Sequence, residues 1–200
     1  MAENSRENKI FISVELKELL YLKINQLGID FIKTKIKENI LNSDYVIKQL
    51  LGECISSSGV QNLSHSDYIC LAEGLMHYLL AITITPSQRK ININNTEVSI
   101  LVPGARDLKN GGEKVIIIQF LKGNEVEYEQ TISELLKIQP TRYNIWLVSY
   151  CPIVTKFPLK NFVIDSESSG NNELVQPFSK LMIEIDNFLG RINYTGFRIL

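Results

Sequence analysis

Charged and amide side chains follow the ends of two expected strands that a glycine-rich turn joins. Asp107 comes shortly after the first strand, and Gln119 and Lys122 stand at the end of the second. A carboxylate and an amine at a strand end can hold a divalent cation and orient or deprotonate an attacking water. The stretch from Leu101 to Lys122 therefore has the outline of a metal-dependent site for hydrolysis.

A second set of metal-binding side chains lies on one expected helix. Cys70, Glu73 and His77 are spaced i, i+3 and i+7, which places them on one helix face. Without a carboxylate or histidine from another element they are a weak signal for a metal site, and a polar seam under the loops is favoured. The chain has no Cys-x-x-Cys pair, so we expect no structural zinc site. Cys54, Cys70 and Cys151 each sit in an apolar context, which predicts buried, unreactive thiols.

Composition and charge describe an ordinary folded protein that has no basic domain. Apolar residues make up 44% and charged residues 22% of the chain, and the formal net charge is −1. Because DNA binding depends on lysine and arginine neutralising phosphates, it would need a local patch that folding assembles. The basic residues near the expected hairpin and its turns are Arg89, Lys90, Arg106, Lys109, Lys114 and Lys122.

The sequence gives no sign of a membrane segment. No apolar run approaches the roughly 20 residues that span a bilayer. The residues up to Lys9 are polar where a signal peptide would be apolar. We therefore expect an intracellular, cytoplasmic protein with no membrane association.

Residues 1–60 predict a helical layer. Apolar residues at helical spacing follow the cap candidates Ser13, Asp30 and Ser43, and Gly28 suits the end of the first helix. A polar, frayed segment is expected before them. The expected helices cover residues 13–28, 30–40 and 43–55.

The small polar residues 56–65 have the composition of a connector. We therefore expect a helical amino-terminal extension, residues 1–60, and an α/β core with a carboxyl-terminal helix, residues 61–200. The expected fold class is α/β (α+β), with an αβββαβ core in which helices flank a mixed sheet.

The first part of the core predicts a helix followed by a hairpin. A largely buried helix over 66–82 leads, after Pro86, to two strands that turn at Asn94 and Asn95. The second of these strands runs from about Glu97 into the stretch that carries the chemistry.

Two later strands are apolar on both faces, which is typical of central strands covered on both sides. They span residues 114–121 and 143–151, and a helix over 125–138 separates them. Strand, helix and strand at this length form a βαβ unit. The two strands should therefore be adjacent and parallel, with that helix crossing one face and helix 66–82 packed on the same sheet.

The carboxyl-terminal residues predict less regular structure. A short strand is expected over 161–165 and a polar loop over 166–172. A last helix should start at Pro177, which suits a first helical position, and end at Gly190. The apolar tail, residues 194–200, is expected to dock as a final strand.

This element order resembles the core of the restriction-endonuclease-like fold, whose metal site follows a PD-(D/E)xK pattern. Within that superfamily, the segment from Pro103 to Lys122 is similar to the hairpin of archaeal Holliday-junction resolvases. In those proteins a Pro-Asp opens the segment, a Lys-Asn-Gly type turn closes it, and an apolar strand then ends in Glu-x-Lys. The resemblance rests mostly on element order and on this one motif.

Three positions depart from the motif. Gly104 stands where the first Asp is expected, Gln119 where the Glu is expected, and Leu121 where the Lys is expected. Glutamine offers a carbonyl oxygen without charge, and leucine offers no ligand or proton acceptor. In this register the catalytic site is dismantled.

A shifted register would keep an active site. Asp107 could supply the carboxylate and Lys122 the amine if a β-bulge re-aims the strand end, and Glu73 could supply the glutamate that resolvase-like enzymes use from their first core helix. Mg²⁺ or Mn²⁺ would then be bound by Asp107 and Glu73. In the alternative interpretation, Asp107 is a turn residue, Lys122 a solvated strand end, and Glu73 a helix-surface charge paired with His77.

Three functional hypotheses follow. The preferred one is a nucleic-acid-associated protein with a nuclease-type fold and a degenerate site that needs no cofactor, in which the basic residues named above contact DNA phosphates. The second is a non-enzymatic assembly subunit that binds a protein partner or forms a homo-oligomer through its helical layer and apolar carboxyl terminus. The third is a live metal-dependent DNA endonuclease, built from Glu73, Asp107 and Lys122.

Overall fold

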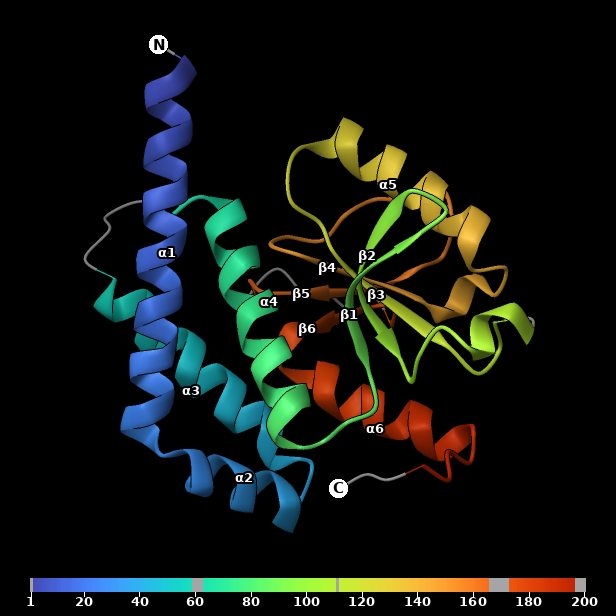
Figure 1. The fold of residues 1–200 in the computed structure, drawn as a ribbon, viewed down its shortest axis with the longest axis horizontal. Helices are drawn as coiled ribbons and strands as arrows, with labels where there is room; N and C mark the ends of the chain where they lie inside the picture. The colour runs from blue at the N-terminus through green and yellow to red at the C-terminus, as the bar shows by residue number, and fades with distance from the viewer. Residues whose placement is uncertain (1, 59–62, 111, 166–172, 197–200) are drawn as a thin grey trace.

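The computed structural model describes residues 2–58, 63–110, 112–165 and 173–196 (Figure 1). Four helices precede a six-stranded sheet whose strands lie in chain order, β1-β2-β3-β4-β5-β6. Helix α5 connects β3 to β4, and helix α6 follows the last strand. No helix among the described residues has the length and apolar character needed to cross a bilayer.

The amino-terminal layer consists of α1 (Ala2–Leu27), α2 (Ile29–Glu38) and α3 (Asn42–Ser57). Helix α1 starts at Ala2, so the prediction of a frayed segment before Ser13 was wrong; no glycine or proline interrupts the polar residues there. Gly28 ends the helix as predicted, with a φ of 93° that favours glycine. Its amide donates to the carbonyl of Ile24 at 3.0 Å.

The two other predicted caps in this layer were wrong. Asp30 lies inside the first turn of α2, because the chain reverses so sharply at Gly28 that the helix begins at the next residue. Ser43 lies inside α3, and its hydroxyl donates to the carbonyl of Ile40 at 2.7 Å instead of accepting from an amide.

Helix α4 (His65–Ile82) starts one residue before the predicted position. The Ser64 hydroxyl accepts from the Asp67 amide at 3.3 Å, and the Asp67 carboxylate accepts from the Ser64 amide at 2.9 Å. This reciprocal pair is a capping box, which satisfies two amides that the first turn leaves free. The predicted boundary at residue 60 falls within residues 59–62, which are not described, and the division into extension and core stays a prediction.

The sheet confirms the predicted mixed topology. Strands β1, β2 and β3 are antiparallel, and β3 to β6 are parallel to one another. Helix α5 (Glu125–Ile138) has the predicted bounds and joins two adjacent parallel strands. The strands are β1 (Gln88–Ile93), β2 (Thr96–Val102), β3 (Ile116–Phe120), β4 (Ile145–Ser149), β5 (Lys160–Val163) and β6 (Val175–Pro177).

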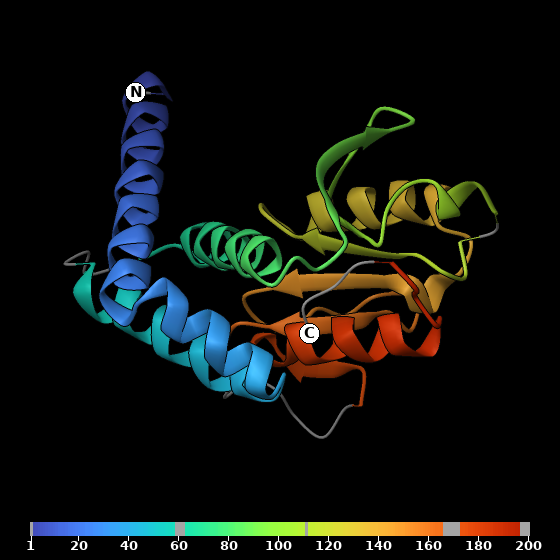
Figure 2. The same ribbon diagram turned by 60° about the horizontal axis from the view of Figure 1, so that its bottom comes forward.

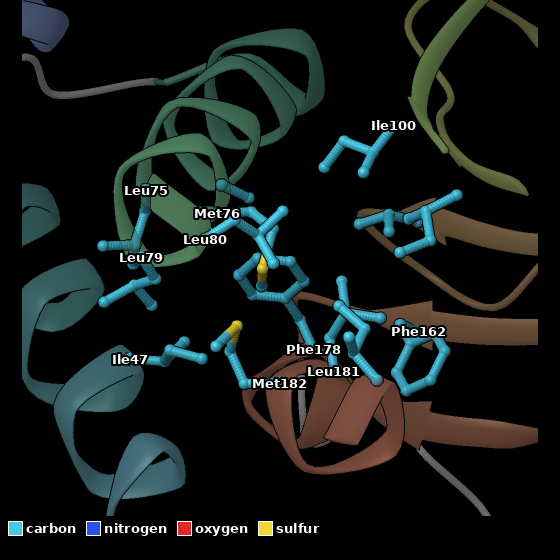
Figure 3. Close-up of a cluster of buried hydrophobic side chains, with 14 of the residues drawn as sticks. Ile47, Leu75, Met76, Leu79, Leu80, Ile100, Phe162, Phe178, Leu181 and Met182 are labelled. Atoms are coloured by element: carbon cyan, nitrogen blue, oxygen red, sulfur yellow. The ribbon is translucent and has the colours of Figure 1, made fainter. Parts of the chain in front are cut away.

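Two hydrophobic clusters lie on the two faces of the sheet. One contains side chains of α1 to α4 and α6 together with Ile116, Ile118 and Phe120 of β3. The other contains side chains of α5 together with Ile117 and Leu121. Figure 3 shows the first cluster, in which α4 residues such as Met76 and Leu80 face the segment that contains Phe178, Leu181 and Met182. The amino-terminal helices therefore share one core with the sheet.

The carboxyl-terminal part differs from the prediction. Residues Val175–Pro177 form β6, and Pro177 closes this strand instead of opening a helix. A proline is tolerated there because β6 is an edge strand. A 3₁₀ turn η4 (Phe178–Lys180) then precedes α6 (Leu181–Arg191), which continues one residue past Gly190.

Two other predictions for this part can be followed only in part. Residues 194–196 are not in a strand, and the rest of the predicted tail strand, 197–200, lies outside the described residues, as does the predicted loop 166–172.

A buried glutamine ties the glycine-rich turn to the connection between α5 and β4. The Gln139 side-chain nitrogen donates to the carbonyls of Gly112 at 3.1 Å and Val115 at 2.8 Å. Its oxygen accepts from the Thr141 amide at 3.0 Å. Gln139 is fully buried, so no water can replace these bonds.

We predict that Gln139→Met, which keeps the side-chain length, lowers the free energy of unfolding by about 1–3 kcal/mol, because it leaves buried backbone groups unpaired. Urea denaturation measures the change. The control is Gln130→Met on the exposed face of α5, where a shift within about 0.5 kcal/mol is expected. Equal midpoints for the two variants would contradict the role of Gln139.

Candidate functional site at the end of β3

An ion pair joins the end of β3 to the middle of α4. The Lys122 Nζ lies 2.5 Å from the Glu73 Oε2. The Glu73 side chain is only 7% exposed, whereas that of Lys122 is 40% exposed. Because side chains alternate along a strand, Lys122 points to the same face as Ile118 and Phe120, which is the face that α4 covers. Glu73 is therefore a buried, paired carboxylate and not the helix-surface charge of the alternative interpretation.

The surroundings of Lys122 keep its amine charged. Burial alone would lower the pKa of Lys122, but the hydrogen bond and the charge of Glu73, with smaller effects of Cys70 and Glu97, outweigh it and raise the pKa. The pair is thus a fixed ammonium held against a buried carboxylate.

Gln119 and Leu121, which stand at the Glu and Lys positions of the Glu-x-Lys motif, face the other side of the sheet. Leu121 is buried in the α5 cluster, and its amide donates to the Val148 carbonyl at 2.9 Å. Gln119 shares this side by strand alternation, and its Oε1 accepts from the Ser99 amide at 3.1 Å. The Gln119 oxygen is thus used to bridge two strands, and Leu121 belongs to the core.

The hairpin of β1 and β2 bends where Gln119 meets it. The pairing of the two strands skips Lys90 and Ser99, and Lys90 has a φ of 49°. Val98 packs in the α5 cluster and Ile100 in the α4 cluster, although residues two apart share a face in a regular strand. Beyond the bend the hairpin rises away from the other strands (Figure 2), and Thr96 Oγ1 donates to Glu134 Oε2 of α5 at 3.4 Å.

Basic residues of β1 lie on the α4 side of this bend. Arg89 is exposed, and its Nη1 donates to the backbone carbonyl of His77 at 3.0 Å. Burial lowers the pKa of His77, and the charges of Arg89 and Lys90 lower it further, against the opposing effects of Glu73 and the Ser99 backbone. Arg89 thus lies against the carboxyl-terminal half of α4.

Asp107 is not close to this group. It opens a 3₁₀ turn η1 (Asp107–Asn110) after β2, and the antiparallel pairing puts Val102 beside Ile116, the first residue of β3. Lys122 lies six residues further along, on the order of 20 Å away for an extended chain. Figure 1 agrees, since the β2–β3 connection and the start of α5 lie at opposite ends of β3. Asp107 therefore pairs with neither Lys122 nor Glu73 in a shared site.

The same topology divides the basic residues that were predicted to contact DNA into two groups, which lie in different parts of the sheet. Arg106 and Lys114 are exposed and flank the connection at the start of β3, where Lys109 is part of η1. Arg89 instead contacts α4, the helix that also provides Glu73, the partner of Lys122. Glu97, the second residue of β2, was not predicted as part of the site, although its charge acts on Lys122; the expected antiparallel order could have pointed to it.

The donor set at the end of β3 does not fit a divalent cation. Glu73 is committed to Lys122, and the Gln119 oxygen to the Ser99 amide. Among the described residues no three His, Cys, Asp or Glu side chains converge as metal ligands, which includes the trio Cys70, Glu73 and His77. The buried carboxylate of the site, Glu73, is neutralised by Lys122, and the other carboxylate that acts on Lys122, Glu97, is exposed, whereas Mg²⁺ or Mn²⁺ would need several converging oxygen ligands.

The cysteines follow the prediction only in part. Cys54 is fully buried, and burial raises the pKa of its thiol to about 11. Cys70, in the second turn of α4, and Cys151, which follows β4, are only half-buried. Next to Cys151, the Tyr150 ring stacks on His65 at 4.2 Å and lies 4.7 Å from the Tyr68 ring.

A cleft of about 1290 Å³ opens on the other side of this edge, between α5 and the chain that follows β4. Its walls are mostly apolar, with Ile132 and Leu136 facing Ile153. At its rim Lys156 and Glu129 are 3.8 Å apart and both well exposed. The charged residues that line the cleft are of both signs, with Glu125 and Lys137 besides this pair.

Comparison with known proteins places the fold. No family model matches the chain, and no curated protein is similar in sequence. A solved complex of the restriction endonuclease PspGI with substrate DNA superimposes with a TM-score of 0.60 at 14% identity, over 88% of this chain and 93% of that one. Metal-depleted Ecl18kI in complex with uncleaved DNA gives 0.52 at 14% identity, over 96% and 87%. The chain has a restriction-endonuclease-like fold, which confirms the predicted resemblance at the level of the fold.

We predict that Lys122→Met lowers the free energy of unfolding by about 1–2 kcal/mol, because it leaves Glu73 buried and unpaired; the value is discounted for the water that screens a partly exposed lysine. Chemical denaturation measures it. Lys156→Met removes a lysine that is 80% exposed, and a change within about 0.5 kcal/mol is expected.

The same pair predicts a pH dependence. Because the pKa of Lys122 is raised above the ordinary value of 10.5, the charged lysine stabilises the fold below that pH and is lost as the pH rises through the folded pKa. The stability difference between the wild type and Lys122→Met should stay constant from neutral pH to about 10 and shrink above it. A difference that disappears below pH 9 would contradict the pairing.

Proposed function

We propose that this chain, with its restriction-endonuclease-like fold, binds DNA at the end of β3 and does not cleave it by metal-dependent hydrolysis. Arg89, Lys90 and Lys122 are the phosphate contacts of this proposal. The observation that carries it is the ion pair between Lys122 and Glu73, which uses the one buried carboxylate of the site to hold a cation of the chain itself. The neighbouring folds, PspGI and Ecl18kI, are DNA complexes, which supports DNA as the ligand.

The loss of metal chemistry follows from charge. Metal-dependent hydrolysis of a phosphodiester needs anionic ligands that hold the cation and a group that handles the attacking water. Gln119 has no charge and Leu121 no proton acceptor, while Glu73 is neutralised by Lys122. Removing such electrostatic stabilisation typically costs about 10²–10³ in rate for a single group.

The overall charge sets the expected strength of binding. A net charge of −1 gives no long-range attraction to a polyanion, so affinity depends on local contacts. Each neutralised phosphate contributes roughly 0.9 to the slope of log K against log salt, so a few cations give a shallow slope and weak binding. Arg106, Lys109 and Lys114 at the other end of β3 are a second group of cations that extended DNA could reach.

A second candidate function is supported by exposed apolar residues of the amino-terminal layer. Leu41 and Tyr45, at the start of α3, are 58% and 62% exposed, and Phe31 of α2 is 43% exposed. Such residues favour a contact with a protein partner or a second copy of the chain. In this proposal the chain is an assembly subunit.

We predict weak, salt-sensitive binding of duplex DNA, measured by fluorescence anisotropy between 50 and 200 mM salt, at about 10⁻⁴–10⁻⁶ M for non-specific contact. Lys122→Met should weaken it and reduce the salt slope by roughly 0.9. Lys156→Met removes the same charge elsewhere and should leave the slope unchanged. Chelation of divalent ions should not change the affinity, because no metal takes part in binding.

Cleavage assays separate the remaining alternatives. Plain duplex and a four-way junction should stay intact with Mg²⁺ or Mn²⁺. Metal-dependent cleavage that Lys122→Met or Asp107→Ala abolishes would instead establish the active endonuclease. If the wild type neither cleaves nor binds, DNA is excluded, and sedimentation of the wild type against Leu41→Glu tests the assembly subunit.

A further inference from the structure

The bend in the hairpin is a local departure from regular structure that needs its own support. A left-handed φ at a non-glycine residue such as Lys90 costs on the order of 1–3 kcal/mol, so surrounding contacts must impose it. The splayed strands also leave backbone amides without their ladder partners. An unpaired buried amide costs roughly another 1–3 kcal/mol.

Two side chains supply the missing partners. Gln119 Oε1 accepts from the Ser99 amide at 3.1 Å, and Ser99 Oγ accepts from the Phe120 amide at 3.3 Å. Ser99 is 4% exposed, so water cannot substitute for these bonds. Gln119 and Ser99 thus replace two backbone contacts at the point where β2 leaves β3.

The bend determines where the cations of β1 lie. Before it, Arg89 is paired opposite Ile100 in the sheet, beside α4, and its guanidinium is fixed by the His77 carbonyl. After it, Ile91 and Ile93 pack on the α5 side. Without the bend, β2 would continue in the plane of the sheet beside the end of β3.

Helix α4 sets the spacing of the cations. Lys122 binds Glu73 and Arg89 binds His77, and these two helix residues are four apart, about one turn of 5.4 Å. The contact with α4 uses one guanidinium nitrogen of Arg89, and the planar fork has further N–H donors that can bind a ligand. Both cations are therefore held by the same helix, through residues about one turn apart.

We propose that Arg89, Lys90 and Lys122 form one phosphate-binding row and that Gln119 is the residue that positions it. The row would take consecutive phosphates of one nucleic-acid strand, and this ligand rests on the proposed function. The positioning role of Gln119 stands on the geometry of the hairpin and has a test that needs no ligand.

The test variant is Gln119→Met, which keeps the side-chain length and removes the acceptor for the Ser99 amide. The matched control is Gln139→Met, which removes a glutamine bridge at the opposite end of β3. The rescue variant is Gln119→Glu, which keeps an acceptor oxygen. All three are made in the full chain.

The first measurement is the titration of His77 by NMR, with His65, the other histidine of the chain, as the reference. The groups that act on His77 are Glu73, Arg89, Lys90 and the Ser99 backbone. If Gln119→Met releases the hairpin, the cations move away, water enters, and the pKa of His77 rises. Arg89→Met should shift it in the same direction, and Gln139→Met should leave it unchanged.

The exchange rate of the Ser99 amide hydrogen reports directly on the hydrogen bond between this amide and Gln119. Protection should be lost in Gln119→Met and kept in Gln119→Glu. If Gln119→Met does not fold, Ser99→Ala removes the other half of the bridge and should raise the pKa of His77 by a smaller amount. An unchanged His77 titration in the folded variant, or a shift equal to that of Gln139→Met, overturns the positioning role.

DNA binding then tests the ligand. Gln119→Met should reduce the salt slope by roughly 0.9 for each displaced cation of β1, whereas Gln139→Met should keep the wild-type slope. If wild type binds no DNA, the proposed function fails while the His77 titration still decides the role of Gln119. If wild type binds and Gln119→Met keeps its slope, the row is not the phosphate site.

Discussion

The burial of β3 on both faces is the constraint on which the rest of the structure depends. Ile116, Ile118 and Phe120 lie in the cluster under α4, and Ile117 and Leu121 lie in the cluster under α5. A shift of this strand by one residue would turn Gln119 toward α4 and Lys122 toward α5, away from the Ser99 amide and the Glu73 carboxylate that they contact. These polar contacts therefore fix the parity of the residues at the end of β3.

This parity decides which chemistry is available at the end of the strand. It directs Lys122 to α4, where Glu73 is buried, and it directs Gln119 to the α5 side, where it bonds to the Ser99 amide. A buried carboxylate needs a partner, since desolvation otherwise costs several kcal/mol. The lysine satisfies that need, and the same pair leaves one ammonium partly exposed to solvent. In the proposed function this ammonium contacts a phosphate group.

The chain shares its fold with PspGI and Ecl18kI at only 14% sequence identity, so the fold does not depend on particular side chains at the site. The fold requires only a pattern of strands that are apolar on both faces, a crossover helix and a buried helix α4. Many different sequences can supply this pattern. Catalysis requires particular side chains at particular strand ends. The chain meets the first requirement, and fold similarity alone does not assign an activity.

Local sequence by itself determined most of the elements. The bounds of α5, the turn at Asn94 and Asn95, and the adjacent parallel strands β3 and β4 all follow from short-range periodicity and turn chemistry. Strand β6 was not predicted because three residues are too few to show a periodicity. The start of α1 was not predicted because its polar residues carry no apolar stripe.

Only the tertiary structure decided the site. The sequence pattern placed Asp107 near Lys122 because both follow strands, but an antiparallel pair brings the end of one strand to the start of the next. The partner of Lys122 came instead from Glu73, far away in the chain, because α4 packs on the face to which β3 directs its lysine. The hairpin bend at Ser99 depends on the same side-chain contacts across strands. Short-range patterns specify backbone and burial, whereas distances between charges are set by how the elements pack.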